Sequence, residues 1–312
     1  KINFKSTNNK EIMKLSIVIS AYNEEETIEE CLKSVKSLSA EIIFVDNTSQ
    51  DKTVQIANKY TDQVFIRQND PVMLNKNKNF GFSKAAGEWI LSLDSDERLT
   101  PQLVGEIRSK IQTNKFDGYE IPRKNIIFGK WIQHSIWWPD YNLRLFKKDK
   151  GIFPLHHVHE KIKLNGKVSK LTNPMIHYNY KTISQFVNKL NNTYTESEAE
   201  NYLLSKQDIH WYDAIRWPLG DFLKTFFYQS GYKDGFHGLV LSQLQAFYSL
   251  IFFAKVWEKK EKFKDLTPEN FLEAVVQEFK RSSKEIKYWI LECLIQKSPK
   301  KKYFYKILRK FR

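Results

Sequence analysis

The hydrophobic pattern in the first third of the chain alternates between two periods. Short apolar runs typical of buried strands occupy Leu15–Ser20, Glu41–Val45, Val64–Arg67 and Trp89–Leu93. Between the first two runs, apolar residues recur at helical spacing from Ile28 to Val35. Because strands alternate with helices at the spacing of βαβ units, we predict an α/β fold, a mostly parallel sheet covered by helices.

The pattern changes twice further along the chain. Residues Gly118–Tyr180 have a strand-like pattern interrupted by Trp and Pro, which we expect to extend the sheet and form the far wall of a cleft. From Ser184 onward helical patterns dominate, rich in aromatic residues and then strongly charged. We therefore predict an α/β domain of residues 13–183 and a helical C-terminal region of residues 184–312 that contacts a membrane. Residues 1–12 precede a methionine, and we expect a flexible leader there.

The charge of the chain points to anionic partners. Fifty basic and 36 acidic side chains give a formal net charge of +14. Residues Lys297–Arg312 hold eight basic side chains and no acid, and a helix would align Phe304, Ile307, Leu308 and Phe311 in one apolar stripe. An anionic membrane surface suits this tail, although a solubilising basic terminus is the alternative. No nucleic-acid-binding motif accompanies the charge, so we expect no nucleic acid partner.

Cysteine and apolar content bear on the compartment. Cys31 and Cys293 lie too far apart in the sequence to indicate a disulfide framework or a metal knuckle, which favours a reducing compartment. Even the most apolar helical segment, Leu239–Val256, contains Ser, Gln and Lys, so we expect no membrane-spanning helix. The sequence therefore predicts a cytoplasmic protein, peripheral at the inner face of the cytoplasmic membrane.

Two carboxylates, Asp94 and Asp96, directly follow the fourth apolar run. At the carboxyl edge of a parallel sheet such a pair can hold a divalent cation against the phosphates of a nucleotide. A calcium loop of the EF-hand type would need Gly where Leu99 stands, and a D-x-D-x-T phosphatase would need Thr where Arg98 stands. Solvated loop acids remain the alternative to a nucleotide–metal site, which would suit group transfer from an activated donor.

Six segments, in order between residues 14 and 195, together resemble the inverting family 2 glycosyltransferases. These segments are Ser16–Glu25, Val45–Thr53, Asn77–Gly81, Gly87–Arg98, Pro139–Phe146 and Val158–Lys161. The resemblance implies the GT-A fold, a UDP-sugar donor and a Mg²⁺ or Mn²⁺ cofactor. It is closest to the branch that adds sugars to the lipopolysaccharide core.

The resemblance implies a binding site for the nucleotide base and ribose at the first two strand ends. Its residues would be Ala21, Tyr22, Glu24 and Asp46. An aromatic ring can stack on uracil, and a carboxylate can accept its imide hydrogen. Alternatively, Tyr22 is a core aromatic and Asp46 caps a helix. The family usually has Gly after this acid, where Asn47 begins the loop here, and because Asn tolerates left-handed geometry we expect the turn to persist.

The resemblance also implies how the donor's diphosphate is held. Lys78 would face the phosphates, Asp94 would contact the ribose or a metal-bound water, and Asp96 would bind the metal ion. Ser95, between the two aspartates, would belong to the same donor-binding set. His177 is the candidate for a final metal ligand. A bound metal ion would act as a Lewis acid on the leaving group. A solvated lysine at position 78 and a structural histidine at position 177 are the alternatives.

An inverting transfer needs a base that takes the proton of the acceptor hydroxyl. Glu160 occupies the position at which the family carries this acid. A surface acid paired with Lys161 or Lys163 is the alternative. Three histidines precede Glu160, but no cysteine or second cluster completes a metal knuckle, and we assign His159 to the acceptor side.

A segment rich in aromatic residues resembles the acceptor-binding part of the family. We expect Trp137 and Trp138 to stack on sugars, and Asp140 and Arg144 to bind polar or charged acceptor groups. Core packing is the alternative for the tryptophans.

Together these expectations describe a metal-dependent inverting glycosyltransferase. It would move a hexose, glucose from UDP-glucose, to a hydroxyl of a lipid-linked or lipopolysaccharide-core oligosaccharide. One rival is a nucleotidyltransferase on a similar fold, which would have a Gly-rich loop where Ala21–Glu25 stands. The other is a noncatalytic protein that binds glycans or membranes.

Overall fold

The computed structural model describes residues 15–38, 40–70, 75–113, 115–155, 160–205 and 207–310. The expected leader, residues 1–12, and Phe311 lie outside these ranges. The chain forms two compact units. The first unit runs to Lys124 and includes Asp140–Asn179, and the second comprises Asn125–Pro139 and the chain from Tyr180 onward.

A mixed sheet is the framework of the first unit. Its leading strands, in the order β3-β2-β1-β4, are parallel, and β8 joins β4 antiparallel before β6, β12 and β5 complete the order. The strands are β1 Leu15–Ala21, β2 Glu41–Asp46, β3 Val64–Ile66, β4 Trp89–Asp94, β5 Glu97–Arg98, β6 Gly118–Ile127, β7 Lys130–Trp131, β8 Asp140–Lys147, β9 Gly151–Ile152, β10 Lys163–Leu164, β11 Val168–Lys170 and β12 Met175–Tyr180. Strands β7 and β11 pair with β6, and β9 and β10 form a separate ribbon. The predicted α/β architecture is confirmed.

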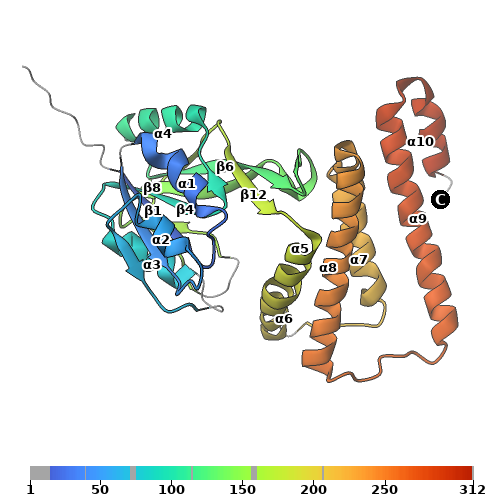
Figure 1. Ribbon diagram of the computed structural model, residues 1–312. Coiled ribbons are helices and arrows are strands. Elements are labelled where there is room, and N and C mark those ends of the chain that lie inside the picture. The colour runs from blue at the N-terminus through green and yellow to red at the C-terminus, as the bar shows by residue number, and fades with distance from the viewer. Residues whose placement is uncertain are drawn as a thin grey trace, which may run out of the picture. The chain divides into compact units, whose positions relative to one another are not determined.

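Helices cover both faces of the parallel strands (Figure 1). They are α1 Ile28–Val35, α2 Thr53–Ala57, α3 Asn75–Lys84 and α4 Pro101–Thr113. Alternate β1 residues such as Ile17 and Ile19 join the core with α1, α2 and α4, whereas Val18 joins the core with α3. This alternation is the period of two that a strand requires when both of its faces are buried.

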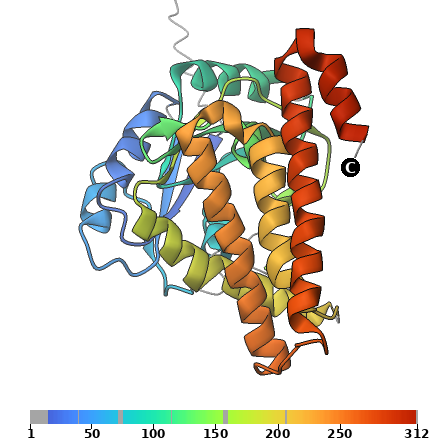
Figure 2. The ribbon, with the colours of Figure 1, turned by 90° about the vertical axis from the view of Figure 1, so that its right-hand side faces the viewer.

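Helices make up most of the second unit. They are α5 Ile183–Lys189, α6 Thr195–Leu204, α7 Asp213–Phe222, α8 Phe236–Glu261, α9 Phe271–Lys297 and α10 Lys302–Lys310. Wider π-type turns follow α5 and α7, at Leu190–Tyr194 and Leu223–Tyr228. Helix α7 packs against α8 and α9, and α10 folds back against α9 (Figures 1 and 2).

Helix α8 differs from the sequence-based expectation. It extends beyond Leu239–Val256 at both ends and is long and apolar enough, by length and composition, to cross a membrane. The polar residues that argued against a span therefore do not exclude one. A single helix of this kind is weak evidence, because a core helix can have the same length and composition.

The segment Asn125–Pro139, which contains β7, is held by the helical unit. Asp234 is buried, and its Oδ1 accepts a hydrogen bond from the Gln133 amide at 3.0 Å. Its carbonyl accepts from Lys130 Nζ at 2.7 Å, and its Oδ2 lies 3.3 Å from His134 Nδ1. The sequence analysis assigned this segment to the wall of the sheet domain, whereas its contacts tie it to the turn before α8.

Candidate active site

The parallel strands end together and thereby align their terminal side chains. Ala21 at the end of β1 pairs with Asp46 at the end of β2, and Ser20 pairs with Asp94 at the end of β4. Such an edge is where α/β sheets bind ligands. The backbone register therefore gathers the acids that the sequence singled out.

Asp46 is a buried acid with unused hydrogen-bonding capacity. Its side chain is 1% exposed, and Oδ2 accepts a hydrogen bond from the Ser49 amide at 2.9 Å. Oδ1 accepts none within the described part of the chain. The following turn is left-handed as expected, but at Thr48, with φ of 61°, rather than at Asn47. Instead, the Asn47 amide bonds to the Ala21 carbonyl at 2.9 Å.

Tyr22 and Glu24 differ in their surroundings. Tyr22 is 44% exposed and therefore is not a core aromatic. The Glu24 amide donates to Thr53 Oγ1 at 2.8 Å, and its carboxylate accepts from Thr27 Oγ1 at 2.5 Å. The Glu24 amide thus ties the loop after β1 to Thr53 at the start of α2, while the Glu24 side chain bonds to Thr27, directly before α1.

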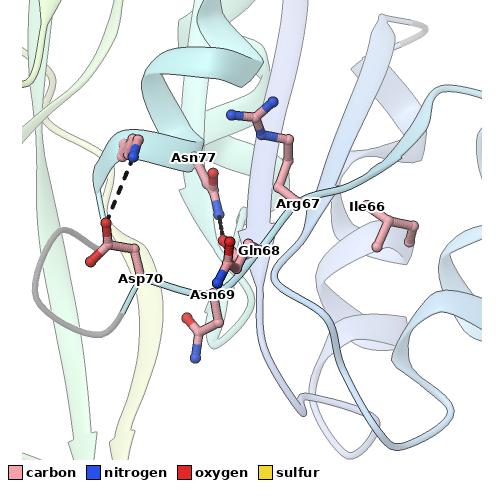
Figure 3. A pocket seen from close by; sticks show the side chains of 7 residues that line it. Ile66, Arg67, Gln68, Asn69, Asp70 and Asn77 are labelled. Atoms are coloured by element: carbon pink, nitrogen blue, oxygen red, sulfur yellow. Dashed lines mark hydrogen bonds and ion pairs between the residues drawn. The ribbon is translucent and has the colours of Figure 1, made fainter.

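A pocket of about 590 Å³ opens beside this edge, at the end of β3. Its lining is Ile66, Arg67, Gln68, Asn69, Asp70, Lys76 and Asn77 (Figure 3). The Asn77 amide group donates to Asn47 Oδ1 at 2.6 Å and to the Gln68 carbonyl at 3.0 Å, and the Arg67 amide bonds to the Asp46 carbonyl at 2.8 Å. Sequence reasoning missed this pocket, although a polar run directly after the third strand was a signal for it.

Asp94 lies between two cations. Its Oδ1 is 2.5 Å from Lys78 Nζ, and its Oδ2 is 2.5 Å from Arg144 NH2. Burial would raise the pKa of Asp94, but the positive charges of Arg144 and Lys78 outweigh it and hold the pKa well below the usual range. Lys78 is therefore not a solvated lysine, and Asp94 is charged at neutral pH.

Glu97 is a second partner of Arg144 that the sequence analysis did not single out. It is fully buried, its Oε1 accepts from Arg144 NH2 at 2.6 Å, and its Oε2 accepts from the Asp94 amide at 3.0 Å. Burial lowers the pKa of Arg144, but Asp94 and Glu97 raise it above its ordinary value. An acid immediately after Asp96 in the motif was the available signal. Ser95 is also buried, and its carbonyl accepts from Arg98 at 2.6 Å.

Asp96 and His177 meet across strands. His177 on β12 pairs with Glu97 on β5, which places its Nε2 3.4 Å from Asp96 Oδ2. His177 is 7% exposed. Among the described residues, no three His, Cys, Asp or Glu side chains form a ready-made metal cluster. A cation between Asp96 and His177 would thus need further ligands from a substrate or from water.

Glu160 is half-buried at the end of a loop. Its Oε2 accepts a hydrogen bond from the Leu155 amide at 2.5 Å, and Leu155 itself has φ of 64°. Residues 156–159 lie outside the described ranges, so His159 cannot be placed.

The proposed acceptor residues fall in both units. Trp137 and Trp138 belong to the second unit, where they make edge contacts with Tyr180 at 6.3 Å and Trp131 at 5.5 Å. Asp140 lies in the first unit and binds Arg123 at 2.6 Å. Arg144, also in the first unit, is buried against Asp94 and Glu97.

Comparison with known proteins identifies the family. The sequence model of Glycosyl transferase family 2 matches residues 16–164. Residues 16–164 form a glycosyltransferase family 2 domain. The matched range contains Asp46, Asp94, Asp96 and Glu160 of this glycosyltransferase, and its fold is of the GT-A type.

Relatives of the glycosyltransferase span different parts of the chain. An uncharacterized glycosyltransferase of Rickettsia typhi is 28% identical over 86% of this chain and 98% of its own length. A GalNAc(5)-diNAcBac-PP-undecaprenol beta-1,3-glucosyltransferase of Campylobacter jejuni is 32% identical over 31% of this chain and 34% of its own. The structure of S. aureus TarS residues 1–349 with UDP-GlcNAc is similar with a TM-score of 0.42 and 17% identity, over 80% of this chain and 92% of that one.

Proposed function

We propose that this glycosyltransferase is metal-dependent and inverting, and that it moves glucose from UDP-glucose to a hydroxyl of a lipid-linked or lipopolysaccharide-core oligosaccharide. The observation that carries the proposal is the cluster of Asp46, Asp94 and Asp96 at the carboxyl edge of the parallel strands. The Campylobacter relative, named as a glucosyltransferase for an undecaprenol-linked glycan, supports the choice of sugar and acceptor.

Asp46 is the proposed recognition group for the base. A buried carboxylate oxygen that lacks a hydrogen-bond donor is destabilising unless a ligand supplies one. The imide N–H of uracil is such a donor, and the exposed ring of Tyr22 can stack on the base. Ala21 and Glu24 complete this part of the site, and the pocket at Arg67 and Gln68 extends it.

Beside the proposed base site, Asp94 is held as an ionised carboxylate between Lys78 and Arg144. Because Lys78 and Arg144 keep Asp94 ionised, its oxygens are available as acceptors for ribose hydroxyls without a change of protonation. Lys78 also brings positive charge toward the diphosphate. We therefore assign Arg144 to the support of Asp94 in addition to its expected acceptor role, and Ser95 to the turn that presents both aspartates.

Asp96 and His177 fit a divalent cation as two protein ligands. A carboxylate oxygen and an imidazole nitrogen suit Mn²⁺, and Mg²⁺ sites commonly take their remaining ligands from substrate phosphates and water. When bound, the cation would stabilise negative charge on the departing UDP as a Lewis acid.

Glu160 is the proposed general base. It would take the proton of the acceptor hydroxyl as the oxygen attacks the anomeric carbon, while the bond from that carbon to the diphosphate breaks on the opposite face. The Leu155 amide fixes one carboxylate oxygen, which orients the group. Trp137, Trp138, Asp140 and His159 are the proposed acceptor contacts.

Two variants test this assignment. Glu160→Gln keeps an oxygen that can accept from Leu155 but cannot act as a base, so we expect transfer to fall by about 10²–10⁴-fold while UDP binding persists. Asp96→Ala should remove the Mn²⁺-dependent part of the thermal shift produced by UDP, whereas Asp62→Ala, at an exposed loop acid, should leave it unchanged. Full transfer activity in both site variants would refute the proposal.

The donor and the cellular location need separate experiments. Thermal shifts with UDP-glucose, UDP-galactose and UDP-N-acetylglucosamine, each with and without Mn²⁺, should be largest for UDP-glucose. A larger shift with another sugar would correct the donor alone. We place the enzyme at the cytoplasmic face of the membrane, where a lipid-linked acceptor would reside.

A further inference from the structure

Helix α9 carries an apolar stripe that the sequence analysis did not single out. The stripe consists of Leu272, Val276, Phe279, Ser283, Ile286 and Ile290, which recur at intervals of three and four residues and so share one helix face. Leu272 is 71% exposed, Phe279 56%, Val276 43% and Ile290 42%. Large side chains exposed in one continuous row indicate a surface that contacts something apolar.

A different face of α9 attaches the helix to the rest of the second unit. Glu278 forms two hydrogen bonds of 2.7 Å with Arg216 on α7, and Trp289 meets Tyr228 edge to face at 5.5 Å. Ser282 on the same side is buried. Phe279, Ser283 and Ile286 of the stripe border this anchored side, where they line a pocket with residues of α7 and α8, and the exposed side chains of the stripe are left available.

Positive charge predominates beside the stripe, and Glu273 is an exposed acid on the same flank of α9. Lys280, Lys284 and Lys287 are exposed and recur at helical spacing along one flank. Between Lys280 and Lys310 the chain has eleven basic and two acidic side chains. Helix α10 adds to this surface, because it packs against α9 and exposes Phe304 and Ile307 among its lysines.

We propose that the α9 stripe is the surface on which this enzyme lies against an anionic membrane. The apolar side chains enter the boundary between headgroups and acyl chains, and the flanking lysines contact lipid phosphates. The inference rests on the membrane contact in the proposed function and places its main part on α9 rather than on the terminal tail.

Charge decides between a membrane and a second copy of the chain. Apolar residues at intervals of three and four are also typical of a coiled-coil seam. Pairing two copies through the stripe would bring their lysine flanks together, and like charges across an interface oppose association. An anionic lipid surface attracts the same lysines.

Vesicle sedimentation of the whole 312-residue chain tests the assignment. We expect binding to an equal mixture of phosphatidylcholine and phosphatidylglycerol, and much weaker binding to phosphatidylcholine alone. Val276→Glu introduces a better helix former but places a negative charge in the stripe, and should lower partitioning at least about tenfold. The matched control Leu204→Glu adds the same charge at a position on α6 that is 80% exposed, and should change partitioning by less than about twofold.

Three further measurements make the result decisive. Phe304→Glu on α10 should reduce partitioning less than Val276→Glu, and the reverse order would overturn the proposal. Sedimentation velocity should show a monomer, whereas a dimer that Val276→Glu dissociates would assign the stripe to self-association. UDP-induced thermal shifts should be unchanged in every variant, which separates membrane binding from the donor site. If Val276→Glu has a clearly lower melting temperature than the unsubstituted protein, Ile290→Glu is tested in its place.

Discussion

The two units of this enzyme place their important side chains by different means. In the first unit, Asp46 and Asp94 stand where parallel strands end, so the backbone register brings them to one edge. In the second unit, Trp137 stands on a segment that is held by Asp234, about a hundred residues later in the chain. A strand repeats its apolar pattern every two residues, so it can be recognised in the sequence. A single buried carboxylate such as Asp234 belongs to no repeating pattern and cannot be recognised in this way. The first arrangement is therefore readable from sequence and the second is not.

The largest expected effect lies in the first unit, at Arg144. Its guanidinium is the shared partner of Asp94 and Glu97, so Arg144→Met would leave the buried Glu97 and the partly exposed Asp94 without the cation they share. We expect a loss of about 3–5 kcal/mol in the free energy of unfolding, measured by urea titration. The control Arg281→Met in the second unit removes a half-exposed guanidinium from Glu278, which keeps Arg216, and from Glu285, and should cost less than about 1 kcal/mol.

The same pairing gives a pH dependence with a defined sign. The pKa of Asp94 is lower in the folded enzyme than in the unfolded chain, so this group stabilises the fold above its unfolded pKa. That stability is lost as the pH falls from the unfolded pKa, about 3.9, through the lower folded value. Arg144→Met should flatten the acid limb of the stability curve, and an unchanged limb would show that Arg144 does not control Asp94.

A smaller effect is expected at Asp234 in the second unit. Asp234→Ala would leave the Gln133 amide without its acceptor, would remove the carboxylate beside His134 and should destabilise the enzyme by about 1–3 kcal/mol. If this segment carries the acceptor tryptophans, the KM for acceptor should rise while UDP binding stays constant. Asp208→Ala, at an exposed acid paired with Lys260, is the matched control. Equal acceptor KM values in the two variants would mean that Asp234 does not position the acceptor segment.

This comparison also shows how far sequence reasoning reached. The sequence predicted the mostly parallel sheet of the first unit, because short apolar runs alternate with helical periodicity. The family resemblance singled out His177, whose Nε2 lies 3.4 Å from Asp96 Oδ2 in the structure. It did not predict Glu97 as the second partner of Arg144, since an acid next to the motif is visible in the sequence but the cation with which it pairs is not. The placement of Asn125–Pro139 with the helices was also missed, because its contacts depend on packing between distant segments.

The two cysteines provide the gentlest test of the contrast, one in each unit. Cys31 in α1 is fully buried, which raises its pKa to about 12, so at pH 8 only about one thiol in 10⁴ is a thiolate. Cys293 in α9 is only partly buried, and this partial burial also raises its thiol pKa. Iodoacetamide at pH 8, followed by mass spectrometry, should label Cys293 first and Cys31 only after denaturation. Equal labelling of the two cysteines in native buffer would show that the sheet core around Cys31 opens as often as the helical unit around Cys293. The two units would then not differ in local opening.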